Sequence, residues 1–415
     1  MLRCITVLLF LAFNLNASDD KENLLLQKLV SKKILTQEEA ETIKEQTHNE
    51  TKDEISANQS SWINNLKPSG DFRFRFQDDH PLGYGTNRDR VRIRLRGRIE
   101  PKISEDIRVG VGIGTGFNNN NLDNLTDKDI ARSTNQTLGD GFSKKSISLE
   151  LGYAEYTPAT WFGLVVGKFK NPIWEPADLI WDTDINPEGL ALKFKGKPSS
   201  EFEIFGTTDV FSLEERGDEP DIIMYVAQAG FNHKVTDKTS YKLGVSYYGF
   251  SDIKGRRLDG STASNSINNK TDGKLLYNYN NIIGAFDLRS KRPFNTRLPL
   301  LSFFVEYVIN ANKNVPSNSK NGYMIGTVLG SEKLEKLCDW QIKYNYALLE
   351  KDSILDILPD SDRYGGKTNM KAQELALSYA LGSNNWLGID FYYGEQLRGA
   401  KLPATVIQLD WNLIF

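Results

Sequence analysis

Arginines at alternate positions are the feature of this sequence that most clearly points to chemistry. Apolar residues such as Phe74 and Ile93 occupy the positions between them. Because side chains of a β-strand point alternately to its two faces, the guanidinium groups share one face of each predicted strand. A wall of like charges attracts anions unless carboxylates neutralise it. The predicted wall consists of Arg73, Arg75, Arg92, Arg94, Arg96, Arg98 and Arg108.

The carboxylates that could oppose this wall lie together in segment 171–188. They are Glu175, Asp178, Asp182 and Asp184, with Trp174 and Trp181 among them. A loop that mixes acids with tryptophans is poorly suited to project into water, so we expect it to fold inward as a constriction loop opposite the arginines. The field between the two charged surfaces would then filter solutes by size and charge. Two alternatives remain open: the arginines pair with carboxylates elsewhere on the wall, or the tryptophans pack on an outer rim.

Other chemistries have little support in the sequence. The three histidines, His48, His80 and His233, have no serine motif beside them, so we expect no enzyme. Only Cys338 remains beyond the N-terminal leader, which excludes a disulfide framework and a cysteine metal site. No glycine-rich phosphate loop precedes a helix, and we expect no cofactor and no metal. The formal net charge of -3 and aromatic residues that face away from the arginines argue against a nucleic-acid partner.

The elements that would position these residues are strands. From residue 70 onward, apolar and polar residues alternate in segments separated by turn residues, and a mean hydropathy of -0.45 excludes a helical membrane protein. The last segment has Leu409, Trp411 and Phe415 on one face and Asp410 on the other, and resembles the closing strand of bacterial outer-membrane barrels. We count about sixteen strands of the length that a tilted membrane strand needs. After the arginine-rich segments 70–76, 90–100 and 107–113, the predicted strands are 147–157, 161–169, 188–196, 201–211, 222–234, 240–250, 279–290, 300–310, 322–332, 338–349, 371–382, 386–396 and 404–415.

The predicted fold class is therefore all-β, a transmembrane antiparallel β-barrel. The connections sort by length, with short turns such as 158–159 on one side and long segments such as 117–143, 170–187 and 351–370 on the other. Outer-membrane barrels have this pattern, whereas a soluble sandwich does not. A charge on the lipid face costs about 2–4 kcal/mol at the bilayer midplane, so the arginines are expected to face the lumen.

The N-terminal part has a different pattern. Arg3 and the apolar run after it have the form of a signal peptide over residues 1–17. Residues 18–60 are polar and helix-prone, and Thr36 with Glu39 forms a capping box that would open a short helix. We expect a periplasmic helical leader over 18–60, with a solvated, partly helical segment as the alternative, and the barrel over 61–415.

Several motifs resemble the putative-porin family of Gram-negative outer membranes. The leader sequence Ile34-Leu35-Thr36-Gln37-Glu38-Glu39-Ala40 is similar to an N-terminal segment of many family members. Segment 167–172 is also similar to one in phosphate-selective porins, but the lysine-rich ladder of those channels is missing here, which puts phosphate specificity in doubt. The motifs that carry the family resemblance are Gly70-Asp71-Phe72-Arg73-Phe74-Arg75, the arginine-rich strand that follows, Gly167-Lys168-Phe169-Lys170-Asn171-Pro172, Trp181-Asp182-Thr183-Asp184 and Glu188-Gly189-Leu190-Ala191.

The resemblance implies an outer-membrane porin, a passive diffusion channel for small hydrophilic solutes or ions. Its partners would be outer-membrane lipid and the solutes themselves and, by analogy with the architecture, two further copies in a homotrimer. The leader would lie in the periplasm. A different class stays open: a plugged structural or adhesive barrel that binds partners through its external loops.

Overall fold

A computed structural model describes residues 30–32, 36–43, 66–81, 86–116, 131–217, 219–251, 253–269 and 271–415. The chain divides into two compact units, Met1–Leu66 and Lys67–Phe415. The predicted signal peptide and most of the predicted leader lie outside the described residues.

The first unit contains a short helix over residues 37–43. The backbone N–H and the hydroxyl of Thr36 donate to the Glu39 carboxylate at 2.8 and 2.9 Å, and the Glu39 N–H donates to the Thr36 hydroxyl at 3.2 Å. The predicted capping box is thus confirmed. Within the described parts of the chain, no helix combines the length and the apolar character needed to cross a membrane.

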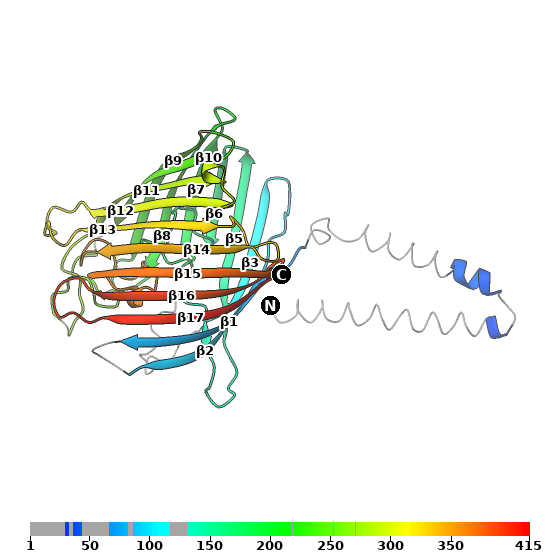
Figure 1. Cartoon of the computed structure of the whole chain (residues 1–415), viewed down its shortest axis with the longest axis horizontal. Coiled ribbons are helices and arrows are strands. Elements are labelled where there is room, and N and C mark those ends of the chain that lie inside the picture. Colours follow the sequence, from blue (N-terminus) through cyan, green and yellow to red (C-terminus); the bar gives the residue numbers. More distant parts are fainter. Residues whose placement is uncertain are drawn as a thin grey trace. The chain divides into compact units, whose positions relative to one another are not determined.

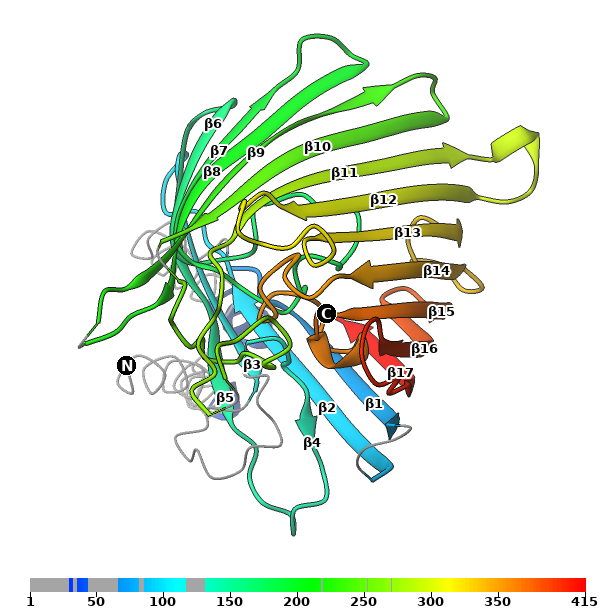
Figure 2. The same ribbon diagram turned by 90° about the vertical axis from the view of Figure 1, so that its left-hand side faces the viewer.

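The second unit is one closed antiparallel sheet in which each strand pairs with its neighbours in sequence and β17 returns to β1 (Figures 1 and 2). Sixteen strands form the barrel wall, which confirms the predicted fold class. The wall strands are β1 (Ser69–Pro81), β2 (Arg88–Ile99), β3 (Ile107–Thr115), β5 (Ile147–Ala159), β6 (Phe162–Lys168), β7 (Glu188–Gly196), β8 (Phe202–Glu214), β9 (Ile222–Lys234), β10 (Thr239–Phe250), β11 (Asn280–Lys291), β12 (Leu300–Asn310), β13 (Asn321–Gly330), β14 (Trp340–Leu349), β15 (Met370–Gly382), β16 (Asn385–Gln396) and β17 (Ala404–Ile414).

One further strand, β4 (Gln136–Thr137), was not predicted. β3 pairs with β2 only over the stretch from Arg96 to Ile99, so the rest of β2 is unpaired by β3 on that side. There β4 pairs with β2 opposite Arg92 and Ile93. The first long loop thereby completes the wall.

The barrel closes through the last strand. The backbone groups of Gly70 and Phe415 exchange hydrogen bonds of 2.8 and 3.0 Å, and Arg75 lies opposite Asp410 in the register. Leu409 is 44% exposed on the outer face, whereas Asp410 is 6% exposed on the inner face. The alternation of the sequence thus separates an apolar outer band, suited to lipid, from a polar interior.

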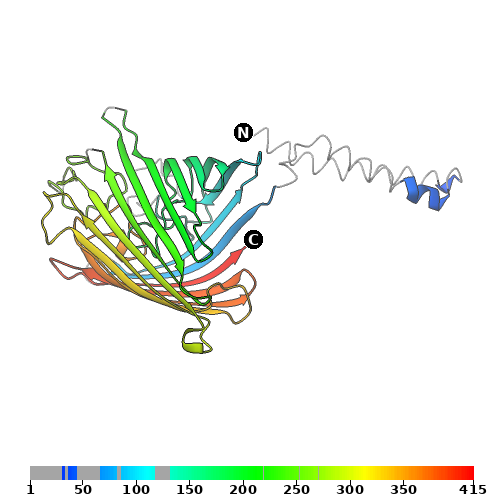
Figure 3. The same ribbon diagram turned by 90° about the horizontal axis from the view of Figure 1, so that it is seen from above.

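The connections differ in length at the two ends of the barrel (Figures 1 and 3). The described parts of the long ones, including 131–146, 169–187, 253–269, 271–279 and 350–369, lie at the long-loop end, and short turns lie at the opposite, short-turn end. The predicted sorting of loops is therefore present. In one detail the prediction was wrong: β5 continues through Ala159, so its turn is at 160–161.

Part of the interior is apolar. On β9, Ile222 and Met224 face inward and are 1% exposed, while Tyr225, the residue after Met224, is 47% exposed and faces outward. Segments 169–187 and 350–369 enter the barrel and pack against such residues; the second is the orange ribbon inside β14 and β15 in Figure 2. Such strands carry apolar residues on the inner face as well, because inward-folded loops and not water cover that face.

Candidate functional site

The arginine ladder lies on the inner face of the first strands. Arg75 is 2% exposed, and its Nε and Nη2 atoms donate hydrogen bonds to the two oxygens of the Asp410 carboxylate, both at 2.7 Å. Its Nη1 atom also reaches Asp362 of segment 350–369 at 3.1 Å. A guanidinium held by two carboxylates in this way is fixed in direction and largely neutralised.

Arg94 and Arg96 share two carboxylates. Both donate from Nε to Asp71, at 2.9 and 2.8 Å. From the opposite side, Asp184 of segment 169–187 lies 3.1 Å from Arg96 and 3.9 Å from Arg94. The inward segment therefore meets the ladder at Asp184.

The other ladder arginines also have polar partners, a possibility that the sequence left open. Arg73 donates to Asn135 at 2.8 Å, and Arg92 donates to Gln77 at 3.0 Å. Arg98 and Arg108 lie nearer the short-turn end and pair with Glu100 and Glu155 at 3.4 and 3.5 Å.

Only Asp184 of the four acidic candidates contacts the ladder. Asp178 binds Arg363 at 2.8 Å and Lys343 at 3.7 Å, and Glu175 accepts a hydrogen bond of 2.7 Å from the Tyr248 hydroxyl. These two acids thus dock the segment against the opposite wall.

The remaining acid, Asp182, joins the two inward segments. It accepts the backbone N–H groups of Asp184 and Ser361, both at 2.9 Å. Burial, together with the charge of Asp184, raises the pKa of Asp182 to about 8. Burial likewise raises the pKa of Glu175 to about 8.

Aromatic and glycine residues explain why segment 169–187 turns inward. The backbone N–H and carbonyl of Trp174 exchange two hydrogen bonds of 2.8 Å with the Gln228 side chain, and its ring packs edge-on against Phe205. Trp181 is 5% exposed, so both tryptophans lie on the inner wall and not on an outer rim. At the base of the segment, Gly167 and Gly189 are paired in the β6–β7 register with φ of 114° and 150°. A Cβ at either position would lie 2.3 or 2.1 Å from a backbone oxygen, so only glycine fits.

A second inward segment, 350–369, was missed by the sequence analysis, which placed it outside. Arg363 is 2% exposed and bridges Asp178 and Glu374 at 2.8 and 2.7 Å. Arg132 of the first long loop donates to three backbone oxygens of this segment. The one available signal was the apolar stretch from Ile354 to Leu358, which is unusual for an external loop.

Hydroxyl groups of a third loop hold the same segment. Asp352 and Asp356 are fully buried. Asp352 accepts from Ser266 at 2.7 Å, and Asp356 accepts from Thr262 at 2.7 Å and from Ser264 at 3.1 Å. Asp352 and Asp356 thus accept hydrogen bonds from a neighbouring loop and fix segment 350–369 to it.

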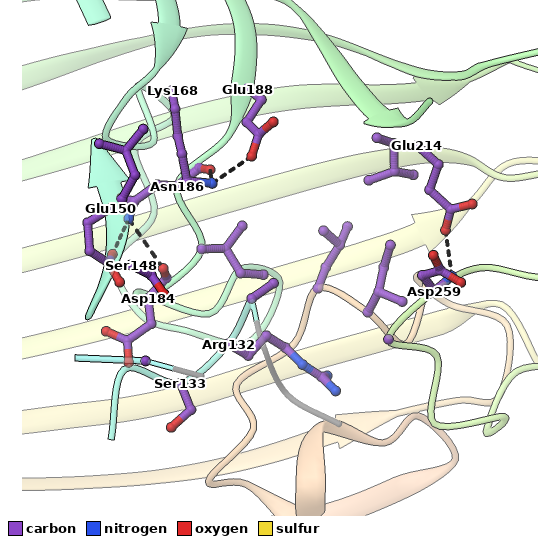
Figure 4. Close-up of a pocket in the computed structure, with 18 residues that line it drawn as sticks. Arg132, Ser133, Ser148, Glu150, Lys168, Asp184, Asn186, Glu188, Glu214 and Asp259 are labelled. Carbon is purple, nitrogen blue, oxygen red and sulfur yellow. Dashed lines mark hydrogen bonds and ion pairs between the residues drawn. The ribbon is translucent and has the colours of Figure 1, made fainter. Parts of the chain in front are cut away.

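Two of the cavities in the interior are lined by described residues that include the site. The first, about 430 Å³, lies toward the long-loop end beside Glu150, Lys168 and Glu188 (Figure 4). The second, about 330 Å³, lies in the short-turn half between the ladder and strands β14 to β16. Asp184 borders the first cavity and Thr183 the second, so the contact of Asp184 with the arginines separates them. The described residues contain no group of three or more His, Cys, Asp or Glu side chains arranged for a metal ion.

Comparisons with known proteins give a consistent assignment. The family model described as putative porin matches residues 79–280 and 277–415. Among solved structures, the chain is similar to OprB of Pseudomonas putida, with 12% identity, a TM-score of 0.54 and coverage of 84% of this chain and 94% of that one. It is also similar to the channel DcaP of Acinetobacter baumannii, with 13% identity, a TM-score of 0.47 and coverage of 84% and 97%. No curated protein matches significantly.

The family and the fold indicate a channel in the Gram-negative outer membrane rather than an enzyme. The sixteen-strand closed barrel, the sorting of its loops and the family match over most of the barrel lead to one conclusion: this chain belongs to the putative-porin family and is an outer-membrane porin.

Proposed function

We propose that small hydrophilic solutes and ions diffuse through this porin from one cavity to the other past Asp184. The observation that carries the proposal is the position of Asp184, which lies against Arg94 and Arg96 and borders the first cavity. The ion pair that Asp184 forms there fixes the inward segment against the ladder, so the segment narrows the path and restricts passage by size. The ladder arginines line one side of the path.

In this proposal the two ends of the barrel face different compartments. The short-turn end faces the periplasm together with the leader, and the long loops face outside, as in other barrels of this kind. A signal peptide over residues 1–17 would direct export. The chain carries no catalytic activity in this proposal.

The test is single-channel recording of the refolded protein in a planar bilayer. Wild type is expected to give discrete current steps. Asp184→Ala is expected to increase the size of these steps, because it removes the side chain that narrows the path. Glu335→Ala is the control, since Glu335 is 60% exposed in a turn and pairs only with Lys333. Correctly inserted barrels without current steps would contradict the proposal.

One observation favours the alternative of a plugged structural or adhesive barrel. Leu179, Ile180, Ile354 and Leu355 are fully buried inside the wall, so loops fill much of the long-loop half. In that case the inserted barrel would carry no current, and Asp184→Ala would leave the bilayer silent. The same recording therefore decides between the two functions.

A further inference from the structure

We propose that this pore prefers cations, and that Asp390 is the residue that sets this preference. The inference rests on the proposed function, since it requires that ions cross the barrel. A ladder of arginines, taken by itself, would instead suggest a path for anions.

The first step is that the arginines are neutralised. Arg75 is held between Asp410 and Asp362, and Arg96 between Asp71 and Asp184. A paired guanidinium has a weak field beyond its partner, because the two opposite charges cancel at a distance. Passing anions therefore meet little free positive charge at these positions.

The second step is the balance of charge around the second cavity. Four cationic side chains line it: Arg73, Arg75, Arg94 and Lys343. Six carboxylates line it: Asp178, Asp360, Asp362, Glu374, Asp390 and Asp410. Arg363 lies behind this lining and binds three of the carboxylates, Asp178, Asp360 and Glu374. With Arg363 included, the carboxylates still outnumber the cations by one, and one unmatched negative charge raises the local concentration of cations.

The first cavity offers little positive charge to an anion. Its two cationic side chains are Arg132 and Lys168. Arg132 is 4% exposed and is committed to the backbone oxygens of segment 350–369, and Lys168 is paired with Glu188 at 2.7 Å. Two of its carboxylates, Asp184 and Glu214, are in turn paired with Arg96 and Arg216. An ion that crosses both cavities therefore meets paired charges in the first and an unmatched carboxylate in the second.

The carboxylates of the second cavity differ in whether a cation is paired with them. Glu374 is bound by Arg363 and Lys343, and Asp410 by Arg75. Asp390 on β16 borders the same cavity, and among the described residues none forms a hydrogen bond or ion pair with its carboxylate. A carboxylate that faces the cavity without a paired cation acts on passing ions with a field that no partner cancels.

The neighbourhood of Asp390 suits small cations with some apolar character as well as metal ions. Trp386 and Tyr392, two aromatic residues of the same strand, also border the cavity. Aromatic faces attract cations such as alkylammonium groups within about 6 Å. The expected permeant class is therefore alkali cations and small ammonium-bearing solutes.

The test is the reversal potential in a KCl gradient across a planar bilayer. Wild type is expected to prefer potassium over chloride, and Asp390→Asn is expected to reduce the permeability ratio about twofold or more, because one unpaired charge is removed at constant side-chain shape. Asp390→Lys should move the preference toward chloride. Glu335→Gln, which removes an exposed charge in a turn, should leave the ratio unchanged.

The outcomes separate this inference from the proposed function. Silent bilayers with correctly folded barrels would overturn both. Current steps with chloride preference in wild type would overturn the cation preference and leave the channel intact. Current steps with potassium preference that Asp390→Asn does not change would overturn the role of Asp390. The shift of SDS-gel mobility on heating, a property of intact barrels, checks the folding of each variant.

Discussion

At the scale of single residues, Arg363 is a buried cation on which the position of both inward segments depends. It is buried between Asp178 of one inward segment and Glu374 of the wall. The cost of burying a charge is offset only while its partners remain in place. Arg363 therefore links the two inward segments to β15.

We predict that Arg363→Gln releases segment 350–369. Removing one member of a buried ion pair costs about 3–5 kcal/mol, because the partner carboxylates stay buried without their cation. The variant should show larger current steps and faster proteolysis within the segment. The matched control is Arg398→Gln, since Arg398 is 51% exposed and pairs with Glu350 at 3.1 Å; such surface pairs contribute about 0–1 kcal/mol. Equal proteolysis of both variants would contradict the role of Arg363.

We also predict that docking of segment 169–187 weakens as pH rises. Burial raises the pKa of Glu175 from an ordinary 4.5 to about 8. Between these two pH values the docked carboxyl keeps a proton that the released one has lost, so stability is full below 4.5 and declines up to about 8. The measurement is the thermal midpoint of the detergent-solubilised barrel between pH 5 and 9.

Glu175→Gln is the comparison for this prediction. The amide keeps an acceptor for the Tyr248 hydroxyl and has no proton to lose. The decline of the midpoint with pH should become shallower, with a remainder from Asp182, whose pKa is also raised to about 8. An unchanged slope in this variant would show that Glu175 does not control docking.

At the scale of elements, the hairpin of β6 and β7 directs segment 169–187 into the barrel. Gly167 and Gly189 face each other at the point where the chain leaves the wall. Both have positive φ and both approach a neighbouring backbone oxygen too closely for a side chain. These glycines, within the two family motifs, let β6 and β7 keep this backbone conformation against the neighbouring strands β5 and β8 at the base of the inward segment.

We predict that Gly189→Ala destabilises the barrel by about 1–3 kcal/mol, a typical cost of backbone strain. Its Cβ would lie 2.1 Å from the Val210 oxygen, so the strand must shift. Gly97→Ala on β2 is the control, because its Cβ has no neighbour within 4 Å among the described residues. The readout is the thermal midpoint of each variant; a midpoint of Gly189→Ala equal to that of Gly97→Ala would refute the argument.

At the scale of the whole molecule, the barrel wall is lowest at β6. This strand has 7 residues, whereas β3 and β7 have 9 and β1 and β5 have 13. A membrane strand needs about 9–11 residues to cross the hydrocarbon core. The low part of the wall therefore suits contact with another copy better than contact with lipid, which supports the proposed homotrimer.

We predict a mass of three chains in native mass spectrometry of the detergent-extracted protein. Val166→Arg, on the outer face of β6, should reduce the assembly to single chains because it introduces a charge into the contact. Phe303→Arg, on the outer face of β12, should leave the trimer intact. Wild type that runs as a single chain would contradict the trimer.

The sequence by itself determined the wall. Alternation is a local property, so the strands, the outward position of Leu409 and Trp411 and the inward position of Arg75 could be predicted without any long-range contact. The capping box of Thr36 and Glu39 is local in the same sense.

Only the tertiary structure decided how the interior is filled. Arg132 meets the backbone of Gly366, and Asp178 meets Arg363, although these residues lie far apart in the chain. No periodicity encodes such contacts, because they depend on which loops enter the barrel and where their side chains then lie. For the same reason the ladder arginines could be identified from the sequence, whereas their partners could not. That Asp390 has no paired cation also became visible only in the tertiary structure.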